Sequence, residues 1–263
     1  MNIDFDILII DDEQVVIDSI IKIGQINNYA IDSALDAQIA LNKIDINKYS
    51  LIICDIMMPG INGFQFITEM QNRNNKTPIV ITTGYSTLDN AVKSLYQGAI
   101  DYIPKPFTID EMISVMKRGI NYYKLISKIE SDPNSVAFVP CPPKYFRLGY
   151  SCWVNNGFDG SYLLGATDIY IKTIEDLKGI ELIDIGETVH QASVIARFKS
   201  SDDTTHQLFS ALSGRIIDRN EKLIENISLL EKDPYFNGWI YRLIPNELDY
   251  EMRILSSCSS DRT

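Results

Sequence analysis

Basic side chains are scarce in this sequence, which has 24 Lys and Arg residues against 35 Asp and Glu residues and a formal net charge of −11. The acidic excess is present in residues 1–125 and again in residues 126–263. Proteins that bind nucleic acid usually present a basic face to the phosphate backbone. We therefore expect no direct nucleic-acid binding by either half of the chain.

Histidine and cysteine are also rare. The sequence has two histidines, His190 and His206, and four cysteines with no C-x-x-C spacing. These numbers exclude the common zinc-site patterns, and no Ser/His/Asp nucleophile set is evident. We expect the cysteines to be reduced thiols, as in a cytoplasmic protein, and Cys54 to act as a small buried apolar residue.

Long apolar runs are absent, since none approaches the roughly 18 residues of a membrane-spanning helix. The first five residues include Asp4 and no basic residue, so we expect no secretory signal. These features predict a cytoplasmic protein without a membrane anchor. The 263 residues are enough for two ordinary domains.

A short apolar run over residues 51–54 ends in Asp55 and is followed by a Met-Met-Pro-Gly turn, which is typical of a strand buried on both faces. Similar runs alternate with segments of helical periodicity through the first half. The expected strands are 7–10, 29–33, 51–55, 78–84 and 99–104, and the expected helices lie near 15–23, 37–44, 64–70, 88–95 and 110–130. This alternation predicts a doubly wound, five-stranded parallel α/β sheet.

The carboxyl ends of parallel strands meet at one edge of a sheet, and polar residues follow the expected strands there. These residues are Asp11, Asp12, Asp55, Thr83 and Lys105. Carboxylates brought together repel one another, and an oxygen-only ligand set of this kind suits Mg²⁺. An Asp carboxylate can also act as a nucleophile and form an acyl phosphate.

Four motifs with this order and spacing resemble the receiver domain of response regulators over residues of about 5–125. The motifs are Asp11-Asp12, Asp55-Ile56-Met57-Met58-Pro59-Gly60, Thr82-Thr83-Gly84 and Asp101-Tyr102-Ile103-Pro104-Lys105-Pro106. The resemblance implies that Asp55 accepts a phosphoryl group from a sensor histidine kinase or a phosphotransfer protein. It implies no enzymatic activity beyond this self-phosphorylation and slow autodephosphorylation.

The same resemblance assigns roles to the other motif residues. Asp11, Asp12, Asp55 and the backbone carbonyl of Met57 would hold Mg²⁺ or Mn²⁺, and Lys105 would neutralise a phosphoryl oxygen, with a cis bond to Pro106. Thr83 and Tyr102 would form the switch pair. A homodimer is compatible with this likeness.

Breaks at Ser131–Ser135 and Cys141–Lys144 indicate a domain boundary. We expect a receiver domain at 1–130, a linker at 131–145, a mainly β module at 146–255 and a disordered tail at 256–263. Within the module we expect a short helical region at 171–179, a strand at 215–218, and a helix at 223–227 capped by Asn220, with Trp153 and Trp239 in the core. Tyr122, Tyr123 and Ile126 either cover an interface or pack within the receiver.

Three segments of the second half resemble the glycine-cleavage H protein, a lipoyl-carrier fold of the biotinyl/lipoyl class. They are residues 165–168 with 177–186, residues 208–214 with 220–221, and residues 233–235 (Asp-Pro-Tyr) with 238–240 (Gly-Trp-Ile). The family carries lipoate on a lysine at a hairpin tip, whereas the corresponding position here is Asp203 in a polar turn. We expect no lipoate, and Lys199 is the nearest alternative carrier.

These observations predict a phosphorylation-dependent response regulator of a two-component system, in which an H-protein-like domain acts through protein–protein contacts with an unidentified partner. The alternatives are a receiver-regulated lipoyl carrier modified at Lys199 and a transcription factor. The acidic second half argues against direct DNA binding.

Overall fold

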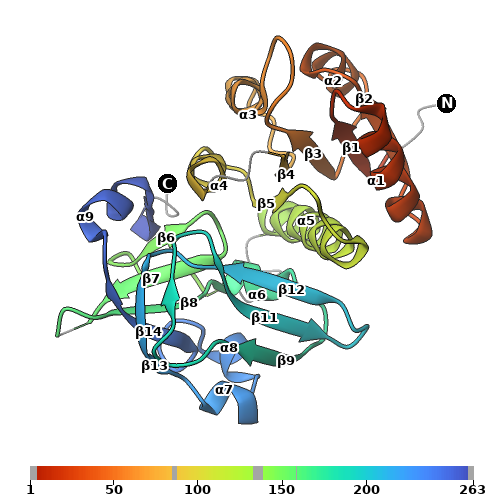
Figure 1. Ribbon diagram of the computed structural model, residues 1–263. Helices are drawn as coiled ribbons and strands as arrows, with labels where there is room; N and C mark the ends of the chain where they lie inside the picture. The colour runs from red at the N-terminus through yellow and green to blue at the C-terminus, as the bar shows by residue number, and fades with distance from the viewer. Residues whose placement is uncertain (1–4, 85–87, 133–138, 158, 260–263) are drawn as a thin grey trace. The chain divides into compact units, whose positions relative to one another are not determined.

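The computed structural model describes residues 5–84, 88–132, 139–157 and 159–259, and the chain divides into two compact units, 1–131 and 132–263 (Figure 1). Each unit has its own sheet system and its own buried core. The units are described separately below.

The first unit alternates strands and helices as predicted. Its elements are β1 (Ile7–Ile10), α1 (Gln14–Ile26), β2 (Ile31–Ala34), α2 (Ala37–Ile44), β3 (Leu51–Asp55), α3 (Gly63–Asn72), β4 (Ile79–Thr83), α4 (Leu88–Tyr96), β5 (Asp101–Pro104) and α5 (Ile109–Ser131). The strands are all parallel, in the order β2-β1-β3-β4-β5. The predicted five-stranded, doubly wound α/β fold is confirmed.

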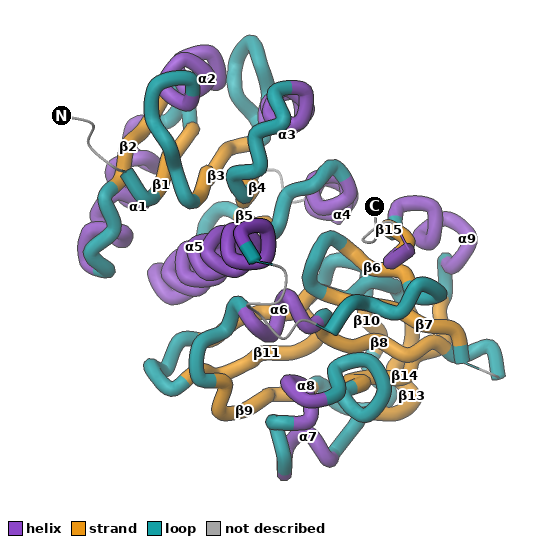
Figure 2. The backbone as a smooth tube through the Cα atoms, turned by 180° about the vertical axis from the view of Figure 1, so that it is seen from behind, coloured by secondary structure: helices purple, strands orange, loops and turns teal. Residues whose placement is uncertain are grey.

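Helices cover both faces of this sheet, with α1 and α5 side by side on one face and α2, α3 and α4 on the other (Figures 1 and 2). Every residue of β1, β3 and β4 is buried, because a central parallel strand is enclosed from both sides. Isoleucine and methionine side chains of α1 and α5 pack against β1 and β3 to form one core cluster. This packing fixes the carboxyl ends of the strands at one edge.

The second unit is mainly antiparallel β-structure. Its strands are β6 (Phe146–Leu148), β7 (Cys152–Asn156), β8 (Tyr162–Ala166), β9 (Leu177–Leu182), β10 (Thr188–Val189), β11 (Val194–Ser200), β12 (Thr205–Phe209), β13 (Gly214–Arg219), β14 (Trp239–Pro245) and β15 (Ser256–Ser257). They form a seven-stranded sheet, β10-β13-β14-β8-β7-β6-β15, and a three-stranded sheet, β12-β11-β9. The short helices are α6 (Asp168–Lys172), α7 (Lys222–Glu225), α8 (Leu229–Lys232), α9 (Leu248–Glu251) and η1 (Met252–Ile254).

Trp153 on β7 is fully buried, as predicted, and its indole nitrogen donates to the carbonyls of Ala166 at 3.0 Å and Pro234 at 3.1 Å. Gly165 on the neighbouring strand leaves room for the ring, since a Cβ there would lie 2.5 Å from the Trp153 side chain. Trp239 is only partly buried, because it packs at the margin of the same aromatic cluster.

Local helix predictions in this unit are partly wrong. The region 171–179 contains the end of α6 and the start of β9. Asn220 does not cap a helix through its side chain, because its amide group instead donates to the carbonyls of Asn237 and Trp239, each at 2.8 Å. The predicted strand at 215–218 is confirmed within β13.

The prediction of four reduced thiols is wrong, because Cys141 and Cys258 form a disulfide. The predicted disordered tail is also wrong for the described residues 256–259, since β15 pairs with β6 and Cys258 is fully buried. Residues 260–263 lie outside the described part of the chain. At the amino end of the second unit, Cys141 and Tyr145 pack in its buried core. The predicted linker 131–145 is therefore too long at its C-terminal end, because these residues belong to the folded unit.

Candidate phosphoryl-acceptor site

Three parallel strands bring Asp11, Asp55 and Lys105 to one edge of the first sheet. Asp11 follows β1, Asp55 is the last residue of β3, and Lys105 follows β5. The Lys105 ammonium nitrogen lies 2.6 Å from Asp11 Oδ2 and 2.9 Å from Asp55 Oδ1. The two carboxylates are almost completely buried, so this lysine supplies the positive charge that compensates them.

Burial and ion pairing shift the acid–base properties of the site. Burial raises the pKa of the Asp11 carboxyl above its usual value, although hydrogen bonds from Lys105 and from the Glu13 amide oppose the shift. Burial also disfavours the charged form of Lys105, but its bonds to Asp11 and Asp55 outweigh this effect and raise its pKa. Lys105 therefore remains cationic throughout the neutral range.

Backbone groups orient the two carboxylates. Asp55 Oδ2 accepts a hydrogen bond from the Met57 amide at 2.7 Å, and Asp11 Oδ1 accepts one from the Glu13 amide at 3.0 Å. Gly63, the first residue of α3, lies directly against the Asp55 backbone, where a Cβ would be 2.5 Å from the Asp55 carbonyl oxygen. The requirement for glycine at this position was not recognised from the sequence, where Asn62-Gly63 indicated only a loop.

Asn62 begins α3 with a capping box, which holds the loop between Asp55 and the helix. Its side chain accepts from the Gln65 amide at 2.9 Å, and the Gln65 side chain accepts from the Asn62 amide at 3.0 Å. The loop is thereby fixed at the Asp55 strand end and at the helix start.

Thr83 and Tyr102 occupy neighbouring strands, as the sequence predicts. Thr83 ends β4 and is buried, and its carbonyl accepts from the Lys105 amide at 2.8 Å. Tyr102 lies on β5 with a buried side chain, and burial raises the pKa of its phenol, with a smaller contribution from Asp101. The peptide bond between Lys105 and Pro106 is cis, as expected.

The donor set fits a magnesium ion in part. Asp11 and Asp55 offer carboxylate oxygens next to each other, which is the chemistry that Mg²⁺ prefers, together with retained waters. Asp12, the third predicted ligand, is exposed. Among the residues that the structure describes, no group of three or more His, Cys, Asp and Glu side chains is close enough to hold a metal ion. Within these residues, protein carboxylates would thus supply only part of the coordination.

A buried ion pair between α5 and the start of β5 was missed by sequence reasoning. The Arg118 guanidinium on α5 binds the carboxylate of Asp101 on β5 and donates to the Ser114 hydroxyl at 2.6 Å. Arg118 and Asp101 are both buried. The sequence offers no signal for this pair, since Arg118 falls within a helix of ordinary amphipathic composition.

The hairpin β11–β12 of the second unit contains the expected lipoyl position. Asp203 lies in the turn with φ of 61°, and its neighbour Asp202 accepts from the Ser200 hydroxyl at 2.6 Å. Lys199 belongs to β11, not to the turn, and its register partner on β12 is Thr205. The Lys199 ammonium lies 2.5 Å from Glu181 Oε1 on β9.

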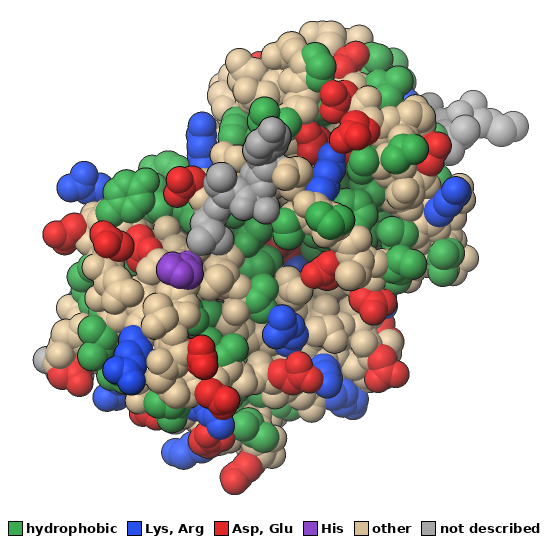
Figure 3. Space-filling model, viewed as in Figure 1, with side chains coloured by type: hydrophobic (Ala, Val, Ile, Leu, Met, Phe, Trp, Pro, Cys, Tyr) green, Lys and Arg blue, Asp and Glu red, His purple; other side chains and the backbone are tan. Residues whose placement is uncertain are grey.

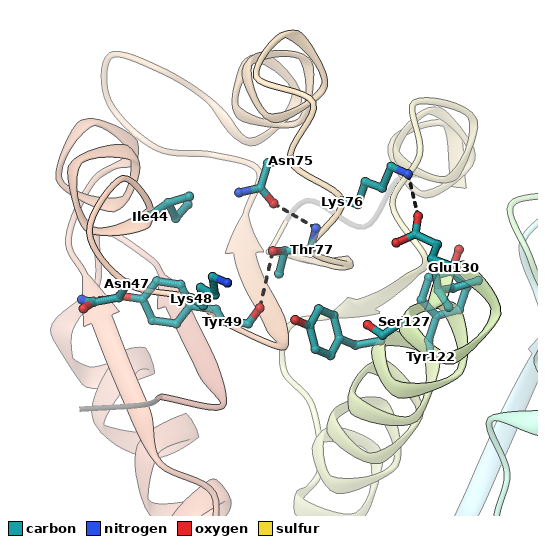
Figure 4. Close-up of a pocket in the computed structure, with 12 residues that line it drawn as sticks. Ile44, Asn47, Lys48, Tyr49, Asn75, Lys76, Thr77, Tyr122, Ser127 and Glu130 are labelled. Carbon is teal, nitrogen blue, oxygen red and sulfur yellow. Dashed lines mark hydrogen bonds and ion pairs between the residues drawn. The ribbon is translucent and has the colours of Figure 1, made fainter. Parts of the chain in front are cut away.

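A separate pocket of about 390 Å³ lies at the opposite edge of the first sheet, near the amino ends of β3 and β4 (Figure 4). Tyr122, Tyr123 and Ile126 of α5 line it, together with loop residues including Thr77. Tyr122, Tyr123 and Ile126 thus border a pocket in the first unit, and the alternative that they cover an interface stays a prediction. The pocket is separate from the Asp55 edge.

On the face drawn in Figure 3, acidic and basic side chains are interspersed and no uniformly basic patch is visible. None of the described helices combines the length and the apolar character that a membrane crossing requires.

Comparisons with known proteins agree with this architecture. The family model described as response regulator receiver domain matches residues 7–117, and the model described as glycine cleavage H-protein matches residues 144–261. The chain therefore carries a response-regulator receiver domain followed by an H-protein-type domain. The predicted family resemblance of both halves is confirmed.

Among curated proteins, the chain is 30% identical over 131 residues to the response regulator MprA of Mycobacterium avium, which covers 50% of this chain and 56% of that protein. It is 40% identical over 84 residues to the DNA-binding transcriptional regulator NtrC of Klebsiella pneumoniae, covering 32% of this chain and 18% of that protein. The chain thus spans less than two thirds of the length of these relatives.

Solved structures resemble each half. The receiver domain of the Francisella response regulator 1452 is 29% identical with a TM-score of 0.43, covering 47% of this chain and 99% of that one. The glycine cleavage system H protein of Mycobacterium marinum is 24% identical with a TM-score of 0.38, covering 40% of this chain and 87% of that one.

Proposed function

We propose that this protein is a phosphorylation-dependent response regulator of a two-component system. Asp55 accepts the phosphoryl group from a phosphohistidine on a sensor histidine kinase or a phosphotransfer protein. The observation that carries this proposal is the buried Asp55 carboxylate at a strand end, 2.9 Å from the Lys105 ammonium and beside Asp11. The protein itself contributes only phosphoryl uptake and slow hydrolysis of the product.

In the transfer step, an oxygen of Asp55 attacks phosphorus, the phosphorus–nitrogen bond of the donor breaks, and the imidazole leaves. An acyl phosphate forms, as is known for carboxylate nucleophiles. The Met57 amide holds the carboxylate in one rotation through its 2.7 Å hydrogen bond to Oδ2. Lys105 then moves from its carboxylate partners to a phosphoryl oxygen and compensates the added charge of about −1.5 to −2.

Asp11 and Asp55 are the residues that would hold Mg²⁺ or Mn²⁺, with Asp12 and the Met57 carbonyl as further expected ligands. The cation would neutralise phosphoryl oxygens and relieve repulsion between the carboxylates. Burial raises the pKa of Asp11, and a positive charge beside this carboxyl would oppose that shift and favour its ionised form. No lipoate is part of this proposal.

The response passes from Asp55 to the surface of α4, β5 and α5. Thr83 moves towards the phosphoryl group and Tyr102 adjusts beside it, so that one local charge change biases a two-state element. Because Tyr102 is already buried here, its accessibility alone does not distinguish the two states. The output is a changed protein–protein contact that involves the H-protein-type domain.

Intact-mass spectrometry of the full chain tests this proposal. Protein isolated from its host is measured before and after incubation with acetyl phosphate and Mg²⁺, beside the variants Asp55→Asn and Asp18→Asn. Asp18 is an exposed residue of α1 and serves as the matched control. We expect one phosphoryl adduct in the natural protein and in Asp18→Asn, and none in Asp55→Asn.

Two results would contradict the proposal. An adduct that persists in Asp55→Asn would place the phosphoryl group elsewhere, and the absence of any adduct with acetyl phosphate or with a phosphorylated kinase would exclude the phospho-acceptor function. A lipoyl mass on the protein before incubation would instead support the carrier alternative at Lys199.

A further inference from the structure

The disulfide between Cys141 and Cys258 joins the two ends of the second unit. The cysteines are 117 residues apart in the sequence, and their Cα atoms lie 5.6 Å apart, within the range that a disulfide requires. Cys141 lies in a segment without helix or strand at the start of this unit, and Cys258 directly follows β15. The bond therefore closes a loop that contains nearly the whole second unit.

Aromatic side chains enclose the bond. Cys141 and Cys258 belong to one buried cluster with Tyr145, Trp153 and Tyr235. The Tyr145 and Trp153 ring centroids are 5.2 Å apart, and those of Trp153 and Tyr235 are 6.1 Å apart. This cluster holds the two sulfur atoms in place and shields them from water, since Cys141 is 3% exposed and Cys258 is 0% exposed.

The C-terminal segment joins the sheet through a short edge strand. Strand β15 has two residues, which pair with Arg147 and Phe146 of β6. The Cys258 amide also donates to the Tyr145 carbonyl at 3.0 Å. A two-residue strand at the edge of a sheet opens more readily than a central strand, and a covalent bond next to it restrains that opening.

We propose that Cys141 and Cys258 are a reversible thiol–disulfide couple that latches residues 256–259 onto β6. The redox partner is a small or protein dithiol as reductant and its disulfide form as oxidant. The latch is independent of Asp55 and its phosphorylation.

The exchange proceeds through a mixed disulfide. A thiolate of the reductant attacks one sulfur during a local opening, the protein sulfur–sulfur bond breaks, and the released cysteine takes up a proton. The second thiol of the reductant then attacks the mixed disulfide and releases the other cysteine, which is also protonated. Two electrons and two protons pass to the protein, and the reductant becomes a disulfide.

The other two cysteines serve as internal references. Cys152 is a fully buried free thiol in the same unit, and Cys54 is a fully buried free thiol in the first unit. Neither has a cysteine partner within the described residues. A two-electron change that involves Cys141 and Cys258 is thus separable from general thiol oxidation.

Alkylation and hydrogen exchange on the full chain test the latch. The protein is equilibrated with oxidised or reduced dithiothreitol, and thiols are counted by intact mass after denaturation in iodoacetamide. We expect two alkylated cysteines in the oxidised protein and four in the reduced protein. In parallel, native hydrogen exchange of residues 252–259 should accelerate at least tenfold on reduction.

Two variants test which cysteine causes the change in hydrogen exchange. Cys258→Ser should show the fast exchange of residues 252–259 under both conditions, whereas Cys152→Ala should retain the full redox response. Four alkylated cysteines after oxidation would overturn the couple, and unchanged exchange of residues 252–259 after complete reduction would overturn the latch. The comparison of oxidised and reduced natural protein decides the question even if Cys258→Ser does not fold.

Discussion

The Lys105 ammonium nitrogen lies 2.9 Å from Asp55 Oδ1, and the same nitrogen lies 2.6 Å from Asp11 Oδ2. One cation thus compensates two carboxylates whose side chains are 4% and 1% exposed. The cation directly follows β5, whereas one anion ends β3 and the other directly follows β1. The site therefore links three strands electrostatically, and its stability and its chemistry depend on the same group.

Removing this cation should destabilise the first unit. In Lys105→Met, two buried carboxylates lose their partner, and we expect a loss of about 3–5 kcal/mol in unfolding free energy. Mg²⁺ should restore part of this loss because it replaces the missing positive charge. Both tryptophans lie in the second unit, so the measurement is hydrogen exchange of peptides from β3 with and without Mg²⁺.

The matched control is Lys76→Met. Lys76 pairs with Glu130 at 2.5 Å, but its side chain is 73% exposed. Solvent screens such a pair, so we expect a change below about 1 kcal/mol. Equal exchange rates in Lys105→Met and Lys76→Met would show that the buried position of Lys105 has no special role.

Gly63→Ala should slow phosphoryl uptake without removing the nucleophile. The new Cβ would lie 2.5 Å from the Asp55 carbonyl oxygen and 2.9 Å from the Ile56 Cα, so the Asp55 loop must shift. Displaced reacting groups lose rate steeply, and we expect a fall of roughly tenfold or more. The rate of adduct formation with acetyl phosphate measures the effect. Gly179→Ala, where a Cβ meets no described atom within 4 Å, should react at the natural rate.

The first unit could be predicted in detail because its signals are local. Strands β1, β3 and β4 are short, largely apolar runs, and the site residues Asp55 and Lys105 stand at the ends of strands. Strand β2 begins at Ile31, two residues later than predicted, because its partly exposed residues give a weaker pattern. Backbone contact between Gly63 and Asp55 has no sequence signal beyond the glycine itself.

Long-range pairings could not be predicted. Arg118 and Asp101 form a buried ion pair across two elements, although each looks like an ordinary surface residue in its own segment. Cys141 and Cys258 are separated by 117 residues, and the serine-rich sequence around Cys258 favours disorder by composition alone. Such contacts depend on how elements are brought together, which local periodicity does not encode.

Burial of the Cys152 thiol should make the second unit lose stability in alkaline solution. Burial raises the pKa of this thiol from 9.0 to about 12, so the folded state keeps its proton where the unfolded state loses it. The contribution of this thiol to the unfolding free energy is then fully present below pH 9. It is lost between pH 9 and 12, with a slope approaching 1.4 kcal/mol per pH unit.

Urea unfolding followed by tryptophan fluorescence at pH 8 to 11 measures this slope. The variant Cys152→Ala removes the titrating group, so its stability should fall less steeply with pH than that of the natural protein, whatever its stability at pH 8. Parallel pH profiles for the two proteins would contradict the assignment to Cys152.

Lipoylation should depend on where a lysine stands in the β11–β12 hairpin. Lys199 lies on a strand and pairs with Glu181, whereas Asp203 projects from the turn with φ of 61°. We expect a lipoyl ligase with lipoic acid to leave the natural protein unmodified and to add one lipoyl mass to Asp203→Lys, at a stability cost of about 1 kcal/mol for the left-handed backbone. Intact mass gives the result. The double variant that combines Lys199→Gln with Asp203→Lys should gain the same lipoyl mass, which assigns the modification to position 203. A lipoyl mass on the natural protein that disappears in Lys199→Gln would reverse the conclusion, because a strand lysine would then suffice as carrier.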